Sequence, residues 1–275
     1  MNAAMRCLAA LAVLIVFSLV FVKPAIADTT VLHHSVYLGG LYLGGIETRI
    51  EEGERHYQIE TSAKTSKNFD WLLRWTIDGN SKGLVSADKL YPLEHRYESI
   101  WNRDLRTVKV DYRKSGKVEV ETTGKPWNPS AHRTPVDPAS LTGSVDPMTA
   151  ILTLTELLDR GENCTTEIPV FDGHRRYDVK VEQQAARYFR PSRLSIFSGN
   201  AIGCRIEVEK RGGFIAGGKI RDLSTQEPVI WAAAPADGAR IVPVRMQMQT
   251  EFGELMLHLD GYQEGSIRLV KQTVK

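Results

Sequence analysis

The sequence predicts a mainly β protein in which one large antiparallel sheet curls and a single helix packs against its concave side. Apolar and polar residues alternate along most of the chain, which is the pattern of half-buried strands. Glycine-containing turns separate the alternating stretches, as in an antiparallel meander. Only one stretch has convincing helical spacing. A sheet of roughly twelve or more strands usually curls or closes.

The composition is that of an ordinary globular protein. The chain has 275 residues, with 35 Lys+Arg, 33 Asp+Glu and 42% hydrophobic residues, which excludes a disordered, collagen-like or disulfide-dense class. Residues 1–27 contain Arg6 and Lys23 and no acidic residue. The remaining chain therefore has zero formal net charge, and nothing in that balance favours nucleic acid as a partner.

Residues 1–27 predict a signal peptide. Arg6 precedes an apolar run over 7–22, which is short for a membrane span of roughly 20 residues. Small residues precede a cut between Ala27 and Asp28 at the positions that signal peptidase prefers. The alternative is an uncleaved N-terminal anchor. We expect a single exported domain over 28–275 with no transmembrane span, located in the periplasm if the source is a Gram-negative bacterium.

The number of cysteines is consistent with an exported protein. Without Cys7, the chain has two cysteines, Cys164 and Cys204, and an even count in an oxidising compartment predicts a disulfide between them. The alternative is two separate buried thiols. No CxxC motif and no clustered Cys and His pattern for zinc is present in the sequence.

The first half of the chain is predicted to be a meander. Gly39-Gly40 and Ser115-Gly116 are the clearest tight turns. We expect strands over residues 31–38, 41–50, 56–61, 71–81, 92–101, 106–112 and 117–122.

A loop and the helix follow. Prolines recur through residues 124–146, and proline cannot donate to a strand ladder, so this segment is predicted to be a loop. Asp146 suits an N-cap and Pro147 suits the first helical turn. Apolar residues at helical spacing then predict a helix over about 147–160, which Gly161 ends.

Strands resume after the helix. Asp172-Gly173 predicts a hairpin turn. We expect strands over residues 165–171, 174–182, 193–197, 204–210, 229–232, 241–250 and 254–262, with the tail from 264 unassigned.

Several segments together resemble a known family. In chain order they are Tyr37-Leu38-Gly39-Gly40, Leu43-Gly44, Val145-Asp146-Pro147-Met148-Thr149-Ala150, Val170-Phe171-Asp172-Gly173-His174-Arg175-Arg176-Tyr177-Asp178, Trp231, Pro243-Val244-Arg245 and Phe252-Gly253. No single piece is specific, but their order resembles the exported bacterial proteins of the domain-of-unknown-function family 3108. The resemblance implies a curved, partly open β-barrel with a helix at its concave side. That fold is similar to the periplasmic lipoprotein carriers LolA and LolB and to another exported β-spiral family of the cell envelope. It implies no catalytic residue.

Motifs for chemistry are missing from the sequence. It contains no nucleophile elbow, HExxH, P-loop or dinucleotide fingerprint. We therefore predict no catalytic residue, no cofactor and no metal site. Asp172-Gly173-His174 is more simply explained as a hairpin tip. A hydrolase with a spatially assembled site, using His174 or His132, is the remote alternative.

Two groups of residues are candidates for binding. Trp71, Leu73 and Trp75 share one face of a predicted strand and either line a ligand-binding concave face or form ordinary core. A basic stretch either attracts anionic lipid or an acidic protein, or is a solvated hairpin face. Its arginines are Arg175, Arg176, Arg187, Arg190 and Arg193.

The sequence thus favours a monomeric, non-enzymatic periplasmic envelope protein that binds a lipid, a lipoprotein tail or another apolar ligand on a curved sheet. The alternative is a structural protein with a filled barrel that supports envelope integrity through protein partners.

Overall fold

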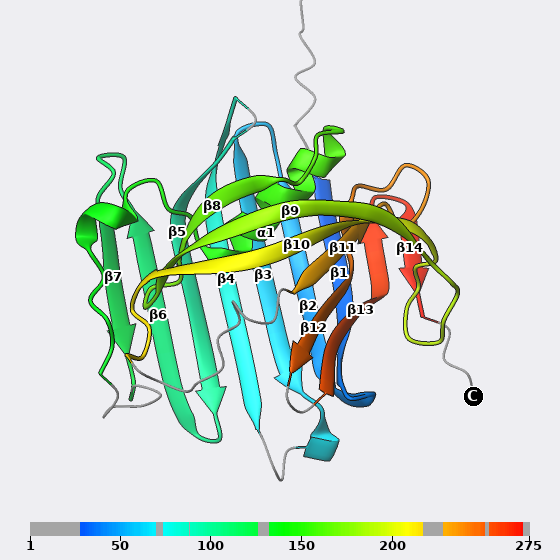
Figure 1. Cartoon of the computed structure of the whole chain (residues 1–275), viewed down its shortest axis with the longest axis horizontal. Coiled ribbons are helices and arrows are strands. Elements are labelled where there is room, and N and C mark those ends of the chain that lie inside the picture. The colour runs from blue at the N-terminus through cyan, green and yellow to red at the C-terminus, as the bar shows by residue number, and fades with distance from the viewer. Residues whose placement is uncertain are drawn as a thin grey trace, which may run out of the picture.

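The computed structural model describes residues 28–69, 74–87, 89–125, 132–216, 228–250 and 253–271. Across these residues, fourteen antiparallel strands form one sheet that hydrogen bonds do not close (Figure 1). The strand order is β7-β6-β5-β4-β3-β2-β1-β13-β12-β11-β10-β9-β8, and β14 pairs with β13. The predicted mainly β class with one helix is confirmed, while the sheet remains an open one.

The first half is the predicted meander. Gly39 and Gly40 both have positive φ, 54° and 85°, as the tight turn between β1 and β2 requires. The first seven strands are β1 (Asp28–Leu38), β2 (Leu41–Glu52), β3 (His56–Thr65), β4 (Trp75–Ser86), β5 (Lys89–Trp101), β6 (Asp104–Tyr112) and β7 (Val118–Thr123). A short 3₁₀ turn, η1 (Lys67–Phe69), follows β3. The strand predicted over 71–81 corresponds to β4, which begins at Trp75, while residues 71–73 lie outside the described residues.

The segment between the two halves contains the helix. A 3₁₀ turn, η2 (Pro138–Leu141), lies within the predicted loop. The helix α1 spans Pro147–Asp159, and the Asp146 side chain caps it by accepting from the backbone N–H groups of Met148 and Thr149.

The second half returns across the first. Its strands are β8 (Thr166–Phe171), β9 (Arg176–Phe189), β10 (Gly199–Gly212), β11 (Val229–Ala233), β12 (Val242–Thr250), β13 (Gly253–Glu264) and β14 (Ile267–Val270). The strand predicted over 193–197 is wrong. This segment forms only an isolated bridge between Ser192 and Ser195, and the Ile196 N–H donates to the Leu259 carbonyl.

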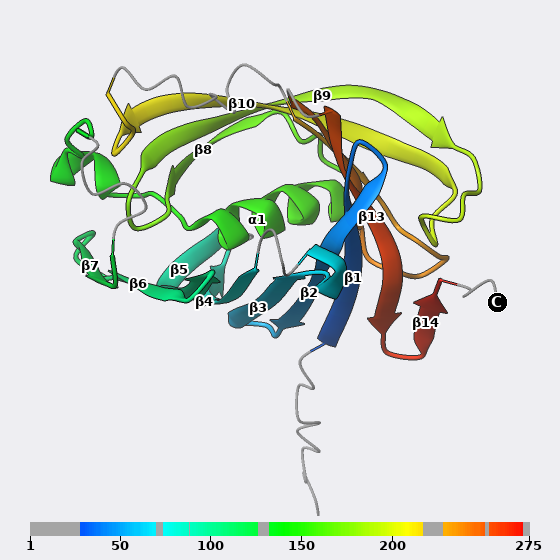
Figure 2. The same cartoon turned by 90° about the horizontal axis from the view of Figure 1, so that it is seen from below.

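The helix lies between two parts of the sheet. Strands β8–β10 pass on one side of α1 and β2–β5 on the other (Figures 1 and 2). Leu152 packs with residues of the first half such as Ile50 and Ile59. Leu154 and Leu158 instead pack among residues of β8–β10. Two-sided burial explains why α1 is apolar around most of its circumference.

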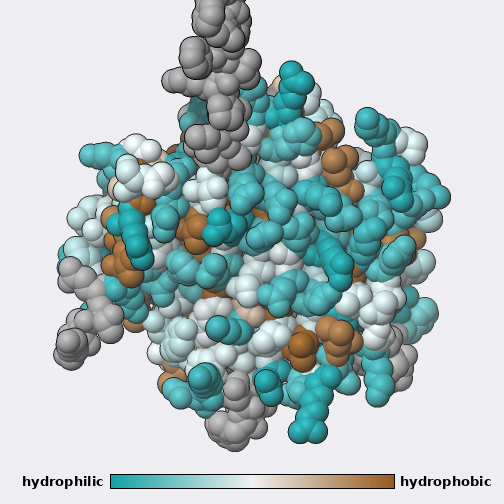
Figure 3. Space-filling model, turned by 180° about the vertical axis from the view of Figure 1, so that it is seen from behind, coloured by the Kyte–Doolittle hydropathy of each residue, from teal (hydrophilic) through white to brown (hydrophobic). Residues whose placement is uncertain are grey.

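The convex side of the first half is polar. Figure 3 shows this side from behind, where hydrophilic side chains dominate and apolar ones form small separate patches. Cross-strand charges such as Lys82 and Glu94 pair there at 3.0 Å. No helix in the described part of the chain combines the length and the apolarity needed to cross a bilayer.

Candidate functional site

A band of partly exposed apolar side chains lines the concave face beyond α1. We call it the apolar trough. Its members are Val36, Ile46, Trp75, Ile77, Met246, Met248, Leu255 and Leu257. Directly opposed residues of an antiparallel ladder share a face. Val36 lies opposite Leu257, which lies opposite Met246, so one apolar row crosses three strands.

Contacts with α1 identify the trough face as the concave one. Ile77 and Ser81 are four positions apart in β4, so their side chains lie on the same face of the sheet. The Ser81 hydroxyl donates to the Asp146 carboxylate at 2.7 Å. A Cβ placed on Gly79, between them on that side, would lie 3.3 Å from the Met148 sulfur. The trough is therefore the part of this face that continues past the helix.

One member of the predicted ligand face lies in the trough. Trp75 begins β4 and sits opposite Trp101 of β5. Its backbone N–H donates to the Thr65 hydroxyl at 3.2 Å. Trp71 and Leu73 lie outside the described residues, as do residues 1–27 with the expected cleavage site after Ala27.

A buried polar network holds the other end of the concave face. Asp146 is fully buried, and besides its two backbone N–H donors it accepts from the hydroxyls of Ser81 and Thr149, at 2.7 and 2.6 Å. The Thr149 hydroxyl lies 2.8 Å from the Tyr57 hydroxyl. Burial raises the pKa of Tyr57, so the phenol stays neutral. The network fastens the helix N-terminus to strands β3–β5.

This network brings a serine, a histidine and an aspartate together, but not as a catalytic triad. Both the Ser81 hydroxyl and the Asp146 carboxylate contact the same ring nitrogen of His95, Nδ1, at 2.8 and 3.5 Å. A triad needs the two partners on opposite ring nitrogens. The three side chains are also at most 4% exposed. They therefore do not supply the relay that the hydrolase alternative requires.

The other residues of that alternative lie at the surface. His174 is exposed at the tip of the β8–β9 hairpin, where its backbone N–H donates to the Asp172 carboxylate. Gly173 of this tip sits against Val108, since a Cβ there would come within 2.3 Å of the valine Cγ1. This contact docks the hairpin onto β6. His132 is exposed as well.

The predicted disulfide is present. Cys164 and Cys204 are bonded, with their Cα atoms 6.2 Å apart. Cys164 lies just before β8 and Cys204 lies in β10, so the bond reaches across the intervening strand β9. Both cysteines are at most 1% exposed and belong to the core beside α1.

The five predicted arginines do not form one patch. Arg175 and Arg176 lie at the start of β9 and bond to Asp172 and Asp178, respectively. Arg187 lies eleven residues further along the same strand, a separation of roughly 35 Å for extended chain. Arg190 and Arg193 follow Arg187 in the β9–β10 connection. The five arginines, although near one another in the sequence, therefore lie in two separate groups.

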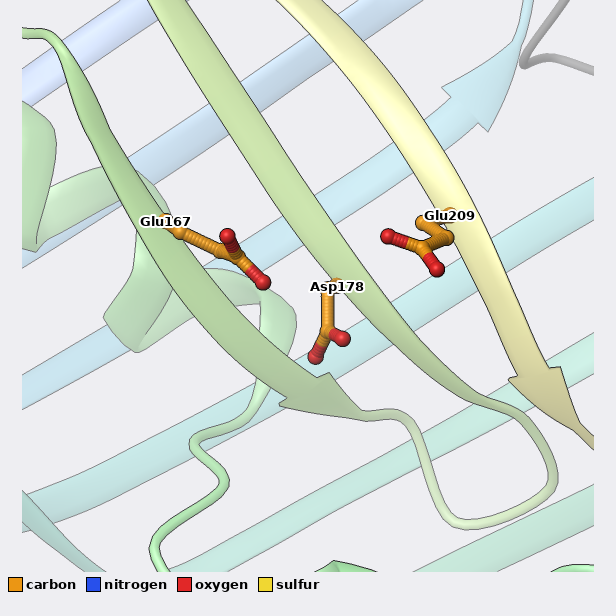
Figure 4. Close-up of side chains that lie close together, drawn as sticks. All are labelled: Glu167, Asp178 and Glu209. Atoms are coloured by element: carbon orange, nitrogen blue, oxygen red, sulfur yellow. The ribbon is translucent and has the colours of Figure 1, made fainter.

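One acidic cluster lies on the outer side of β8–β10. Glu167, Asp178 and Glu209 come from three neighbouring strands and approach one another (Figure 4). Arg211 pairs with Asp178 at 2.5 Å and with Glu209 at 2.8 Å. Lys180 adds another cation beside Glu209. The cluster is thus an interleaved ion-pair network, and the lowered pKa values of Asp178 and Glu209 include contributions from these cations.

His258 lies on the convex face beneath other side chains and is 4% exposed. Its ring packs edge-on against Tyr37 at 5.7 Å between centroids. Burial, with additional repulsion from Arg245, Lys271 and His34, lowers its pKa to about 4, although Asp260 acts in the opposite direction.

We predict that stability falls as pH decreases from 6.5 towards 4. The unfolded chain binds a proton at His258 near pH 6.5, whereas the folded chain binds it only near pH 4. This histidine alone therefore removes about 2 kcal/mol of unfolding free energy at pH 5 relative to neutral pH. Urea titrations at pH 7.5 and pH 5 measure the loss. The His258→Gln variant should show a smaller difference between the two pH values, and an unchanged difference would contradict the assignment.

The fold and these sites define a class of protein, a curled antiparallel sheet around one helix with an apolar concave face. A similar solved structure is the beta-barrel-like protein of domain of unknown function DUF1849 from Brucella abortus. The two sequences are 13% identical, and the structures superpose with a TM-score of 0.51. The match covers 88% of this chain and 99% of that chain. The chain itself belongs to the family described as protein of unknown function, DUF3108, whose model matches residues 33–260. This confirms the family resemblance seen in the sequence. No curated protein matches the chain.

Proposed function

We propose that this DUF3108 protein is a periplasmic, non-enzymatic envelope protein that holds the acyl chain of a lipid or lipoprotein in the apolar trough. The observation that carries the proposal is the row of partly exposed apolar side chains on the concave face. Apolar surface of this kind, gathered on the concave face of a sheet instead of scattered, is typical of ligand sites. The similarity to LolA and LolB stays a prediction.

The dimensions of the trough suit one acyl chain. It runs from β4 to β12 across six neighbouring strands, which at about 4.8 Å per strand spans roughly 24 Å. Acyl chains of one leaflet extend over about half of a hydrocarbon core roughly 30 Å thick. A single chain therefore fits within the breadth of the sheet.

The side chains of the trough also suit a ligand without fixed shape. Met246 and Met248 are unbranched and adapt to irregular partners, and the indole of Trp75 offers a wide apolar surface. All three are partly exposed. Burying them beneath an acyl chain removes apolar area from water, and each well-covered side chain contributes about 1.5–3 kcal/mol.

We predict that Ile77→Gln weakens binding of a fatty-acid probe. The substitution puts a polar amide at the β4 end of the trough, and the lost burial corresponds to a roughly tenfold weaker Kd. Binding of a fluorescent sixteen-carbon fatty acid to the purified protein measures the effect. Native mass spectrometry of protein from its own cells shows in parallel whether a species of lipid mass co-purifies.

Ile100→Gln is the matched control. Ile100 lies on β5 with 41% exposure, and it alternates with the concave Ser99 and Trp101, so it faces the convex side. Its variant should bind the probe within about twofold of the parent. Equal weakening in both variants, or no binding by the parent together with a clean apo mass, contradicts the acyl-chain proposal. The latter result favours the structural protein with protein partners.

A further inference from the structure

The end of the β9–β10 hairpin carries positive charge that has no acidic partner among the described residues. Residues 183–204 contain Arg187, Arg190 and Arg193 and no aspartate or glutamate. All three arginines are exposed. None of them forms an ion pair within the part of the chain that the structure describes. This distinguishes them from Arg175 and Arg176, which have aspartate partners.

Aromatic rings hold Arg187 beside a second arginine. The guanidinium carbons of Arg187 and Arg245 each lie 5.2 Å from the centroid of the Phe189 ring. Arg187 also lies 5.8 Å from the Trp231 ring. Phe189 and Trp231 pack edge to face at 5.3 Å and are both 8% exposed. The two like charges are therefore fixed on a rigid buried platform.

Hydrogen-bonding capacity remains unused at the same place. The Nε of Arg245 is buried without a hydrogen-bond partner, as is the Nε2 of the adjacent His258. One terminal nitrogen of Arg245 donates to the Met256 sulfur, a weak acceptor. Glu254 only partly opposes the lowering of the Arg245 pKa by burial and by Arg187, and the Glu254 carboxylate accepts from Gln247 at 2.8 Å.

Holding the two guanidinium groups of Arg187 and Arg245 side by side is electrostatically unfavourable unless an anion lies between them. Burial first, and then repulsion from Arg187, lower the pKa of Arg245, which means that the positive charge is poorly stabilised by the folded protein. Guanidinium groups bind the oxygens of phosphate through two parallel hydrogen bonds. A doubly charged oxyanion between the two arginines would balance both positive charges.

We propose that Arg187 and Arg245 form a binding site for a phosphate group on the convex face, with Arg190 and Arg193 attracting the anion towards it. The site is independent of the apolar trough. Arg245 lies opposite Trp231 and His258, on the side of β12 away from the trough residues Met246 and Met248. The phosphate belongs either to a soluble anion or to the headgroup of an anionic lipid.

Calorimetric titration with inorganic phosphate and flotation with phosphatidylglycerol vesicles separate the two sources. We expect the purified protein to bind at least one of these probes at low salt and not to float with phosphatidylcholine vesicles. Arg187→Gln and Arg245→Gln should each weaken that binding at least tenfold. Arg103→Gln is the control with the same loss of charge, because Arg103 is exposed in the β5–β6 turn, and it should stay within twofold of the parent.

The outcomes are distinct. Phosphate binding that both site variants weaken supports a soluble ligand, and binding to anionic vesicles alone, weakened in the same way, supports a headgroup. The exposed position of Arg187 keeps the test valid if Arg245→Gln fails to fold. The proposal is overturned if neither probe binds, or if Arg187→Gln behaves like Arg103→Gln.

Discussion

Replacing Asp146 with alanine is expected to lower the free energy of unfolding by about 3–5 kcal/mol. The carboxylate is fully buried, and it accepts from two backbone N–H groups at the start of α1 and from the hydroxyls of Ser81 and Thr149. Its removal leaves four donors without their acceptor inside the core. An unsatisfied buried polar group costs about 1–3 kcal/mol, so the loss exceeds that of an ordinary helix cap.

The matched control is Asp137→Ala. Asp137 caps the turn η2 through the Ala139 N–H at 3.0 Å, but it is exposed, so water replaces the lost bond. We expect a loss of about 1 kcal/mol or less. Urea unfolding followed by tryptophan fluorescence measures both variants. Similar losses in the two variants would show that Asp146 acts only as a local cap.

Removing the disulfide is expected to cost about 4 kcal/mol of unfolding free energy. Cys164 and Cys204 are separated by 40 positions, and a cross-link over a loop of that length restricts the unfolded chain by about this amount. The double variant Cys164→Ala with Cys204→Ala, compared with the parent by denaturant titration, measures the effect. Both side chains are buried beside α1, so packing loss adds to the chain-entropy contribution.

Reduction provides the control for this prediction. A phosphine reductant should lower the stability of the parent chain from Asp28 onward and leave the double variant unchanged. Thiol titration of the denatured, unreduced parent should find no free thiol. Two free thiols, or equal sensitivity of parent and variant to reductant, would be incompatible with the bond.

Local sequence signals predicted the elements well where each element is shaped by its own residues. Alternation between turns located β1–β3 and β5–β7 to within a few residues, and the pair Asp146 and Pro147 fixed the helix start. The segment over 193–197 was wrongly predicted to be a strand because its residues do alternate between polar and apolar. Its backbone meets β13 only at Leu259, so no ladder forms. Strand β14 was unassigned because four residues give too short a pattern.

The sites were only partly predictable because they depend on the register of distant strands. Counting cysteines sufficed for the disulfide, since only one pair remained. The contact of Ser81 with Asp146 joins residues 65 positions apart, and nothing in either local sequence indicates it. The trough similarly needs the ladder that places Val36 opposite Leu257. Knowledge of the alternation identified which residues share a face, but not which strands are neighbours.

The arginines show the same limit from the other direction. Arg176 and Arg187 belong to one strand, and a long extended strand places its two ends in different surroundings. Arg176 pairs with an aspartate, whereas Arg187 lies over aromatic rings. Arg245 shares the Phe189 ring with Arg187. It comes from a distant part of the chain, so this pairing could not be predicted from the basic stretch alone.

The position of β1 determines the order in which the fold can be completed. This first strand lies between β2 and β13, and its ladder to β13 runs from Thr30 with Glu264 to Leu38 with Leu255. Synthesis delivers β13 long after the meander β1–β7, so the growing chain presents β1 as an unpaired edge until then. Unpaired edges promote association between chains, and such distant pairings form slowly. A chaperone that shields β1 during this interval would suppress aggregation more effectively than one that binds the later strands.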